Sequence, residues 1–452
     1  MSAEPESHST DLIYGLHDSP PLRKTLPVAL QHVFAVFVGM VTPPLLIAGA
    51  LQLGAAETAY LVSMSLFVSG AATILQTRQI GPIGSGLLSI QGTSFTFIAP
   101  VISTAGIVMA GGASAQEALG VVFGLCLAGA FMVMLASRFI HLASKVITPV
   151  VTGTVVTLIG LTLIEVGMVS VGGGFAAQGD GTFGSLQNLG LAGLVMVVIL
   201  VFNTSRLPNL RMLSVVLGLA AGYAASLILG IVDLSALREV PALTLPQPFR
   251  YGIGFDWSAL LPFLLMYLIT VMESIGDLTA TSSLTGQPVS GPAYVRRIEG
   301  GLLADGINSA VAACLNSFPS TTFAQNNGVI QLTGVGSRYI GMFIGGILIV
   351  LGLVPAVGVL VQALPPAALG GATLIMFGMV AAAGIRILAR VPMNRRNVII
   401  LSLSLGLGLG VTLVPELMDQ LPPLIRNTLS SGIATGGFCA LVLNVLLPGE
   451  RQ

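Results

Sequence analysis

Two carboxylates lie four residues apart in an apolar stretch of this sequence. Glu273 and Asp277 belong to the run Met272-Glu-Ser-Ile-Gly-Asp277, and residues at this spacing share one face of a helix. Like charges so close together in a low dielectric favour a shared proton over two full charges. We therefore expect this pair to bind and release a proton.

Other polar side chains interrupt apolar stretches elsewhere. Asp305 lies in LLADGIN, His32 in VALQHVFAVFVG, and three consecutive amides follow a break at Gln325 to Asn327. Structural roles are the alternative, since Asp305 or the amides can cap a helix and a lone histidine can simply pack. Glu165 and Glu299 are expected at the membrane–water interface, near the ends of apolar stretches.

The composition indicates the kind of fold that positions these polar residues. Hydrophobic residues make up 54% of the 452 residues, and only 18 Lys or Arg and 18 Asp or Glu are present, where a soluble chain of this length would carry roughly 113 charged residues. So few charges cannot cover a large globule, so lipid must cover most of the surface. The sequence therefore predicts a polytopic α-helical membrane protein.

Apolar runs near twenty residues give fourteen expected spans. They cover 26–49, 58–77, 83–106, 116–137, 146–168, 189–205, 212–231, 257–284, 298–317, 319–334, 339–361, 366–389, 397–415 and 427–447. Both termini and the even-numbered loops hold 15 of the 18 Lys and Arg residues. Because basic residues stay on the cytoplasmic side, both termini are expected in the cytoplasm.

Two pairs of spans indicate an internal repeat. The run from Pro149 to Gly160 resembles that from Pro366 to Gly378, and the third and tenth spans are both interrupted by polar residues. Each pair is seven spans apart, so the second copy is inverted in the membrane. Short antiparallel strands at Leu87 to Ile90 and Ser320 to Phe323 are expected in spans 3 and 10, each followed by a half-helix whose N-terminus faces a central cavity.

Several functions are disfavoured. The net charge is zero without a basic run, which gives no footprint for nucleic acid. Cys126, Cys314 and Cys439 lack metal spacing, and no hydrolase or metalloprotease motif occurs. The polar N-terminus is not a signal peptide. We expect no enzyme activity, no metal site and no cofactor.

The motifs resemble those of the nucleobase/ascorbate transporter family, most closely its bacterial xanthine and uric acid permeases. The family hallmark corresponds here to Gln325-Asn326-Asn327-Gly328, continued by Thr333-Gly334, and is accompanied by Gln31-His32, Gln91-Gly92-Thr-Ser94-Phe95 and Glu273-x-x-x-Asp277. The resemblance extends over residues 20 to 450.

This resemblance implies fourteen spans in a 7+7 inverted repeat, a homodimer, and an elevator-like shift of a core domain against a gate domain. The expected units are a cytoplasmic N-terminal tail (1–25), core (26–137, spans 1 to 4), gate (138–255, spans 5 to 7), core (256–361, spans 8 to 11), gate (362–447, spans 12 to 14) and a cytoplasmic C-terminal tail (448–452). The expected location is the inner membrane.

The resemblance also assigns roles to residues. Glu273 and Gln325 are expected to grip a purine through paired hydrogen bonds, which suits the alternating donors and acceptors of a xanthine edge, and Phe95 to stack on its ring. Asp277, Asp305 and Glu273 are expected in proton coupling. Asn326 and His32 are expected to influence specificity and affinity at the substrate site.

Ser94 stands where some xanthine-selective members have Asn, and its smaller side chain leaves room for the extra oxygen of urate. The predicted function is therefore proton-driven import of xanthine, urate or both. A uracil or other nucleobase permease, for which relatives tend to carry His in place of Asp277 and Glu in place of Gln325, is the first alternative. An anion exchanger of similar architecture is the second, and a membrane enzyme or a channel is less favoured.

Overall fold

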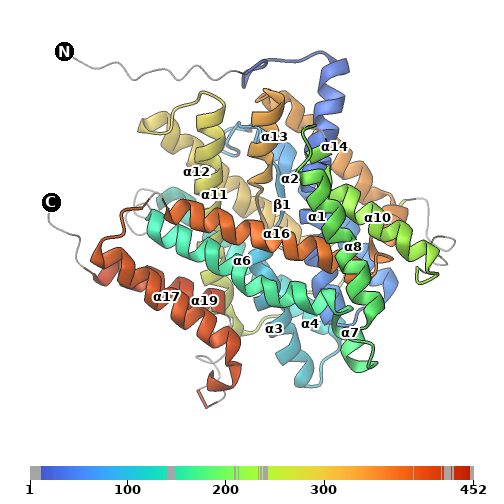
Figure 1. Ribbon diagram of the computed structural model, residues 1–452. Helices are drawn as coiled ribbons and strands as arrows, with labels where there is room; N and C mark the ends of the chain where they lie inside the picture. The colour runs from blue at the N-terminus through green and yellow to red at the C-terminus, as the bar shows by residue number, and fades with distance from the viewer. Residues whose placement is uncertain are drawn as a thin grey trace, which may run out of the picture.

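The protein is mostly helical, and its long helices surround a pair of short strands (Figure 1). The computed structural model describes residues 12–139, 148–207, 210, 211, 213–232, 234, 237, 243–389, 391–418, 420, 421, 429 and 432–447. Residues 1–11 of the predicted N-terminal tail and the predicted C-terminal tail at 448–452 lie outside the described residues. So do several residues of the charge count, namely Lys145, Asp233, Arg238, Glu239, Arg390, Asp419, Arg426 and Arg451.

The helices follow the apolar runs closely. The long ones are α1 (Leu22–Ala50), α2 (Ala55–Arg78), α4 (Ala115–Ala136), α6 (Pro149–Val171), α8 (Leu186–Asn203), α11 (Trp257–Leu284), α12 (Gly291–Cys314), α16 (Pro366–Leu388) and α17 (Arg395–Leu413). Shorter ones are α3 (Ile98–Ala110), α7 (Gly174–Gly179), α10 (Ser214–Ile228), α13 (Gln325–Thr333), α14 (Arg338–Leu353), α15 (Pro355–Gln362) and α19 (Gly432–Leu446), with 3-10 turns η1 (Phe95–Phe97), η2 (Ser137–Phe139) and η4 (Pro415–Met418).

Length and hydropathy single out fewer membrane spans than the fourteen expected. Within the described residues, eight helices are long and apolar enough to cross a membrane, and α14 with α15 forms a ninth, bent candidate. The helices α3, α10 and α19 are shorter. Helix α12 begins before the expected ninth span, which starts at residue 298. Its first two turns therefore include Arg296 and Arg297, which were expected in a loop.

The expected eleventh span, 339–361, is not one straight helix. Its axis bends by 77° between α14 and α15, at the junction of Val354 and Pro355. Proline has no backbone N–H and disfavours the helical conformation of the residue before it, so the helix cannot continue through this point.

The two similar sequence runs fold into two similar helices. Both α6 and α16 have 23 residues and begin at proline, whose fixed φ suits the first helical position. They pack against each other in opposite directions, because Gly153 lies by Gly384 and Gly370 lies by Val171. A Cβ at Gly370 would come within 2.3 Å of the Val171 nitrogen, so small residues allow this close approach.

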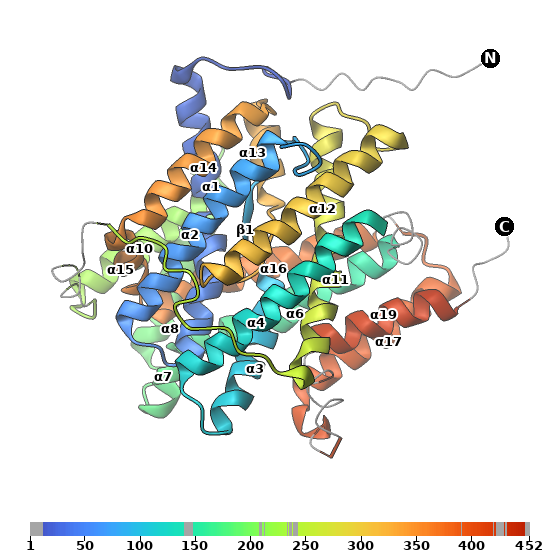
Figure 2. The ribbon, with the colours of Figure 1, turned by 180° about the vertical axis from the view of Figure 1, so that it is seen from behind.

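Packing partners recur between the two halves of the chain. Helix α2 packs on α14 as α4 packs on α12, and α8 packs on α10 as α17 packs on α19. Helix α1 contacts strand β1 (Gln91–Thr93) as α11 contacts β2 (Ser320–Thr322). Figure 2 shows α17 and α19 side by side at the edge of the molecule. The second half therefore repeats the contacts made by the first.

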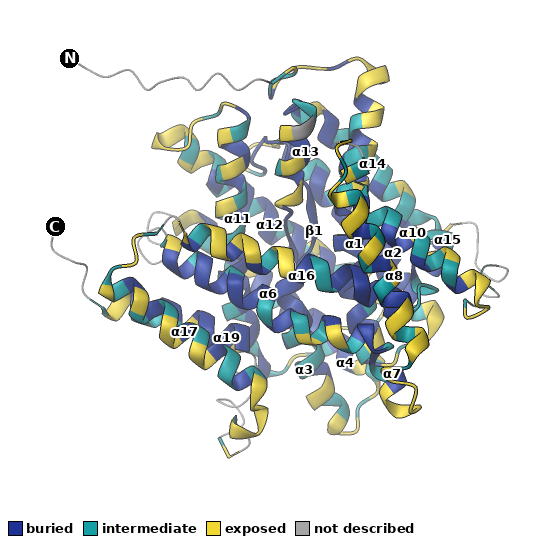
Figure 3. Ribbon diagram, viewed as in Figure 1, coloured by how far each residue is buried: buried dark blue, intermediate teal, exposed yellow. Residues whose placement is uncertain are grey.

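Burial is concentrated around the strands, as Figure 3 shows. The peripheral helices expose apolar side chains instead, for example Val197 and Leu200 on α8 and Leu403 and Leu407 on α17. Exposed apolar faces of this kind are stable in contact with lipid. The helices can lie in a bilayer because their backbone N–H and C=O groups are hydrogen-bonded within each helix. The chain is an integral membrane protein.

Residues 12–18, expected to be part of a free tail, form a strap instead. The backbone nitrogens of Ile13 and Tyr14 donate to the Gly334 carbonyl at 2.7 and 3.2 Å, and the Arg338 nitrogen donates to the Leu16 carbonyl at 3.1 Å. Leu16 is buried. This strap, defined as residues 12–18, therefore fixes the loop between α13 and α14.

Candidate functional site

Two short strands pair with each other at the centre of the molecule. In the antiparallel pair of β1 and β2, Gln91 lies opposite Thr322 and Thr93 opposite Ser320. The first strand lies at Gln91–Thr93 rather than at the expected Leu87 to Ile90, where the Ser89 nitrogen donates a hydrogen bond of 2.8 Å to the Leu87 carbonyl and so closes a tight turn. Hydrogen bonds continue on both sides of the pair, which satisfies the backbone groups of this non-helical segment.

Each strand leads into a short helix that starts near the centre. Ser94 caps η1 by accepting a hydrogen bond from the Thr96 nitrogen, and η1 continues into α3. No side chain caps the start of α13 at Ala324. The positive dipole end of α13 is therefore suited to an electron-rich group of a ligand.

Three carboxylates gather beside the strands. Glu273 and Asp277 on α11 are half-buried, Asp305 on α12 is buried, and Glu273 is close enough to both other groups to interact electrostatically. Thr322 donates a hydrogen bond of 3.1 Å to Oδ2 of Asp277, whereas the buried Oε2 of Glu273 has no partner among the described residues. Such a group can exchange protons or accept a donor from a ligand.

Asp305 lies behind the other two carboxylates. The Nε2 atom of Gln76 on α2 lies 3.4 Å from its Oδ1 atom, and the side chains of Ser274 and Gln91 face it. Gln76 also accepts a hydrogen bond from the Ser85 nitrogen. The carboxylate is thus surrounded by neutral polar groups from three different elements.

The three amides of the hallmark occupy different environments. Gln325 is exposed at the start of α13, Asn326 is buried, and Oδ1 of Asn327 accepts a hydrogen bond of 2.7 Å from Thr281 on α11. The Asn326 amide nitrogen donates to the Leu88 carbonyl. Among the three, only Gln325 is positioned to meet a ligand that enters from solvent.

His32 lies behind Asn326 and is fully buried. Both residues lie beneath the exposed surface of α13. Their influence on specificity and affinity at the substrate site stays a prediction.

Aromatic rings close one side of the site. Phe95 is buried, and its ring meets those of Phe323 and Phe377 edge-to-face at centroid distances of 6.4 and 5.6 Å. The ring of Phe323 covers Gly92, where a Cβ would come within 1.8 Å of a ring carbon. Phe377 belongs to α16, so this cluster connects the strands to the α6 and α16 pair. Ser94, next to Phe95, is buried.

One surface of α11 and α13 is exposed near the carboxylates. Among the described residues, the exposed ones of α13 are Gln325, Gly328 and Gln331, and those of α11 near the site are Gly276, Ala280 and Ser283. Both sets follow helical spacing, and the two helices are in contact. We call this exposed surface the α11–α13 face.

Several residues that complete the site were not predicted from the sequence. Gln76, Thr281, Thr322, Phe323 and Phe377 all contact predicted site residues. Gln76 could have been identified, because an uncharged polar residue deep in an apolar helix is itself a signal. Within the described residues, no group of three or more His, Cys, Asp or Glu residues could hold a metal ion.

A polar centre between two half-helices inside a membrane protein is the arrangement of a secondary transporter. A family model described as "Permease family" matches residues 23–417, and the chain belongs to that family, the nucleobase/ascorbate transporters. The resemblance found in the motifs is thereby confirmed. The chain is a membrane transporter, not an enzyme.

Characterised relatives cover nearly the whole chain. It is 50% identical to xanthine permease XanP of Escherichia coli strain K12, with 99% of this chain and 97% of the relative covered. It is 46% identical to xanthine permease XanQ of the same strain, with 97% of this chain and 94% of the relative covered. It is 36% identical to uric acid permease PucJ of Bacillus subtilis strain 168, with 93% of this chain and 92% of the relative covered.

The fold also resembles solved structures of other transporters. The transmembrane domain of the cyanobacterial bicarbonate transporter BicA superposes with a TM-score of 0.62 at 14% sequence identity, covering 92% of this chain and 99% of that domain. This likeness concerns the fold alone.

Proposed function

We propose that this protein imports a purine, xanthine or urate or both, across the inner membrane. The observation that carries the proposal is the half-buried Glu273, whose Oε2 atom has no hydrogen-bond partner among the described residues, on the helix that packs against α13 with its exposed Gln325. The relatives named for xanthine and uric acid support the substrate class.

Glu273 and Gln325 have complementary chemistry for a purine edge. The carboxylate only accepts hydrogen bonds, while the amide both donates and accepts, so together they match adjacent N–H and C=O groups of the ring. Phe95 supplies an apolar face next to the half-helix start. Asn326 and His32 are proposed to influence specificity and affinity at the same site.

We further propose that the proton gradient drives transport and that no cofactor takes part. Asp277, Asp305 and Glu273 form one interacting group in which protons can be shared. The carboxylates outnumber basic groups at this centre, which disfavours an anion exchanger despite the similar fold. Sodium dependence would contradict the proton proposal.

The proposed topology retains fourteen spans in a 7+7 inverted repeat with both termini in the cytoplasm. The antiparallel α6 and α16 pair and the recurring contacts of the two halves support the inversion. On this basis a core domain (26–137 and 256–361) moves against a gate domain (138–255 and 362–447) as an elevator in a homodimer. The fold shared with BicA is compatible with that division.

The proposal is tested by uptake of radiolabelled xanthine and of urate in a bacterium that lacks its own purine transporters. We expect uptake of at least one purine, inhibited by a protonophore and by Glu273→Gln, with Glu416→Gln as a matched control. Transport of uracil with neither purine taken up would favour the alternative nucleobase permease. Sulfate or bicarbonate exchange would favour the anion exchanger.

A further inference from the structure

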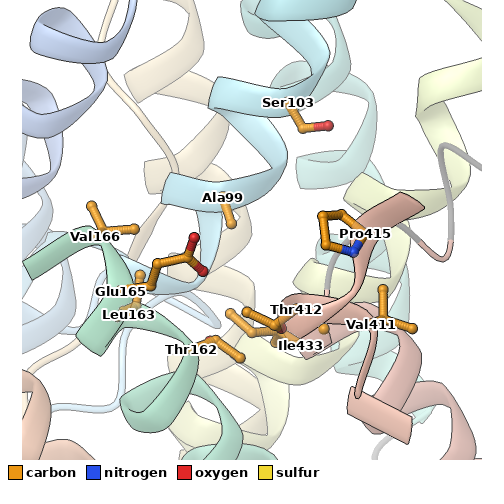
Figure 4. Close-up of a pocket in the computed structure, with 11 residues that line it drawn as sticks. Ala99, Ser103, Thr162, Leu163, Glu165, Val166, Val411, Thr412, Pro415 and Ile433 are labelled. Carbon is orange, nitrogen blue, oxygen red and sulfur yellow. The ribbon is translucent and has the colours of Figure 1, made fainter. Parts of the chain in front are cut away.

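A pocket lies on the other side of the aromatic cluster from the α11–α13 face. Its volume is about 250 Å³, and it lies between α3, α6, the end of α17 and the start of α19. Figure 4 shows Glu165 of α6 extending toward Ala99 of α3, with Thr412 and Ile433 on the opposite wall. The pocket opens where α17 ends, at loops predicted to face away from the cytoplasm.

The lining suits a small planar heterocycle. Glu165 contributes a carboxylate, Ser103, Thr162 and Thr412 contribute hydroxyls, and the other walls are aliphatic or proline, with no basic side chain among the lining residues. Apolar walls with a few polar groups are typical of ligand sites, and this volume lies just below the range for drug-sized ligands. A carboxylate binds ring N–H donors by charge-assisted hydrogen bonds.

The position of the pocket relates it to the central site. Ala99 and Ser103 follow Phe95 by four and eight residues, which is about 6 and 12 Å along a helix axis. On the facing helix, Gly167 is two residues from Glu165 and lies against the ring of Phe377. The contact between Phe95 and Phe377 therefore lies between the pocket and the α11–α13 face.

We propose that this pocket is an outer binding site for the transported purine, in which Glu165 accepts hydrogen bonds from ring N–H groups. The inference rests on the proposed function and adds a residue of the gate to it. External substrate meets Glu165 before it reaches Glu273 and Gln325. Because Glu165 lies on α6 and not on the strand-bearing core, it contributes to binding from the outer side only.

The first test compares substrate affinity on the two sides of the membrane. Xanthine uptake is measured in intact cells, where the outer face meets substrate, and in inside-out vesicles, where the inner face does. Glu165→Gln should raise the external KM about tenfold, as expected for weakening one charge-assisted hydrogen bond, and leave the internal KM unchanged. Glu416→Gln, a nearby exposed glutamate outside the pocket lining, should change neither KM.

The second test detects occupancy directly. Thr412→Cys is introduced into a variant in which Cys314 and Cys439 are replaced by alanine, while the fully buried Cys126 is kept. A membrane-impermeant maleimide should label Cys at position 412, and saturating xanthine should slow that labelling. The variant without Thr412→Cys gives the background.

The possible results separate this inference from the proposed function. If the unmodified protein transports neither xanthine nor urate, the proposed function is wrong. If it transports them but Glu165→Gln leaves the external KM unchanged and xanthine does not slow labelling, only the outer site is wrong. An equal rise of KM on both faces would also overturn it, because a general structural effect is symmetric.

Discussion

The hydroxyl of Thr322 donates a hydrogen bond of 3.1 Å to a carboxylate oxygen of Asp277. Thr322 belongs to β2, where it pairs with Gln91, and Asp277 belongs to α11. The register of the strand pair thus sets the orientation of a carboxylate at the candidate site. A shift of one residue would turn the hydroxyl to the other face of β2.

Thr322→Val tests this contact at nearly constant volume. Loss of a hydrogen bond to a charged partner costs about 1.5 to 3 kcal/mol, so we expect the initial rate of xanthine uptake to fall about tenfold or more at equal protein abundance in the membrane. Thr322→Ser, which keeps the donor, should remain near the unmodified protein. Equal rates for the valine and serine variants would contradict the role of this bond.

Gly92→Ala tests the packing of Phe323. The added Cβ would overlap the aromatic ring, which lies 1.8 Å from the Cβ position, and overpacking costs about 1 to 3 kcal/mol. We expect a lower thermal unfolding temperature in detergent and loss of uptake. Gly106→Ala in α3 is the control, because no atom lies within 4 Å of its Cβ position, and it should be tolerated.

Gln76→Leu tests the support of Asp305. The substitution removes the donor near Oδ1 of Asp305 and the acceptor for the Ser85 nitrogen. Because unpaired buried polar groups are costly, we expect uptake to decrease several-fold while binding of xanthine is retained. Gln116→Leu, at an exposed position, should have no such effect. Normal uptake by Gln76→Leu would show that Asp305 does not need this contact.

Leu16→Asp tests the strap formed by residues 12–18. A charge at this buried position cannot be accommodated against the loop after α13. We expect the strap to detach and the KM for xanthine to rise several-fold, since Gln325 lies on the helix that the strap holds. Ile13→Asp, at a position that is 68% exposed, is the matched control. Proteolysis near residue 16 that increases only in Leu16→Asp would show detachment independently.

Features with a strong local pattern could be predicted from the sequence. The apolar runs predicted most long helices, and the four-residue spacing placed Glu273 and Asp277 together on α11. The polar break before Gln325 indicated the half-helix α13, because no apolar helix would carry three amides at that point.

Contacts between distant segments could not be predicted in the same way. The environment of His32 depends on Asn326, and the orientation of Asp277 depends on Thr322, and neither partner is near in sequence. The bend at Pro355 was missed because hydropathy alone continues through it. The strap was missed because polar terminal residues usually remain unpaired, and its bonds are made by backbone groups that every sequence has.

The pairing of β1 with β2 has a consequence for biosynthesis. The two strands are about 230 residues apart in the chain, so the first strand emerges from the ribosome long before its partner exists. Its polar backbone must wait inside the bilayer or at its surface with temporary hydrogen-bond partners, such as water or the insertion machinery. The first half of the chain therefore cannot reach its final structure by itself. The centre of the protein assembles only after the second half has been inserted.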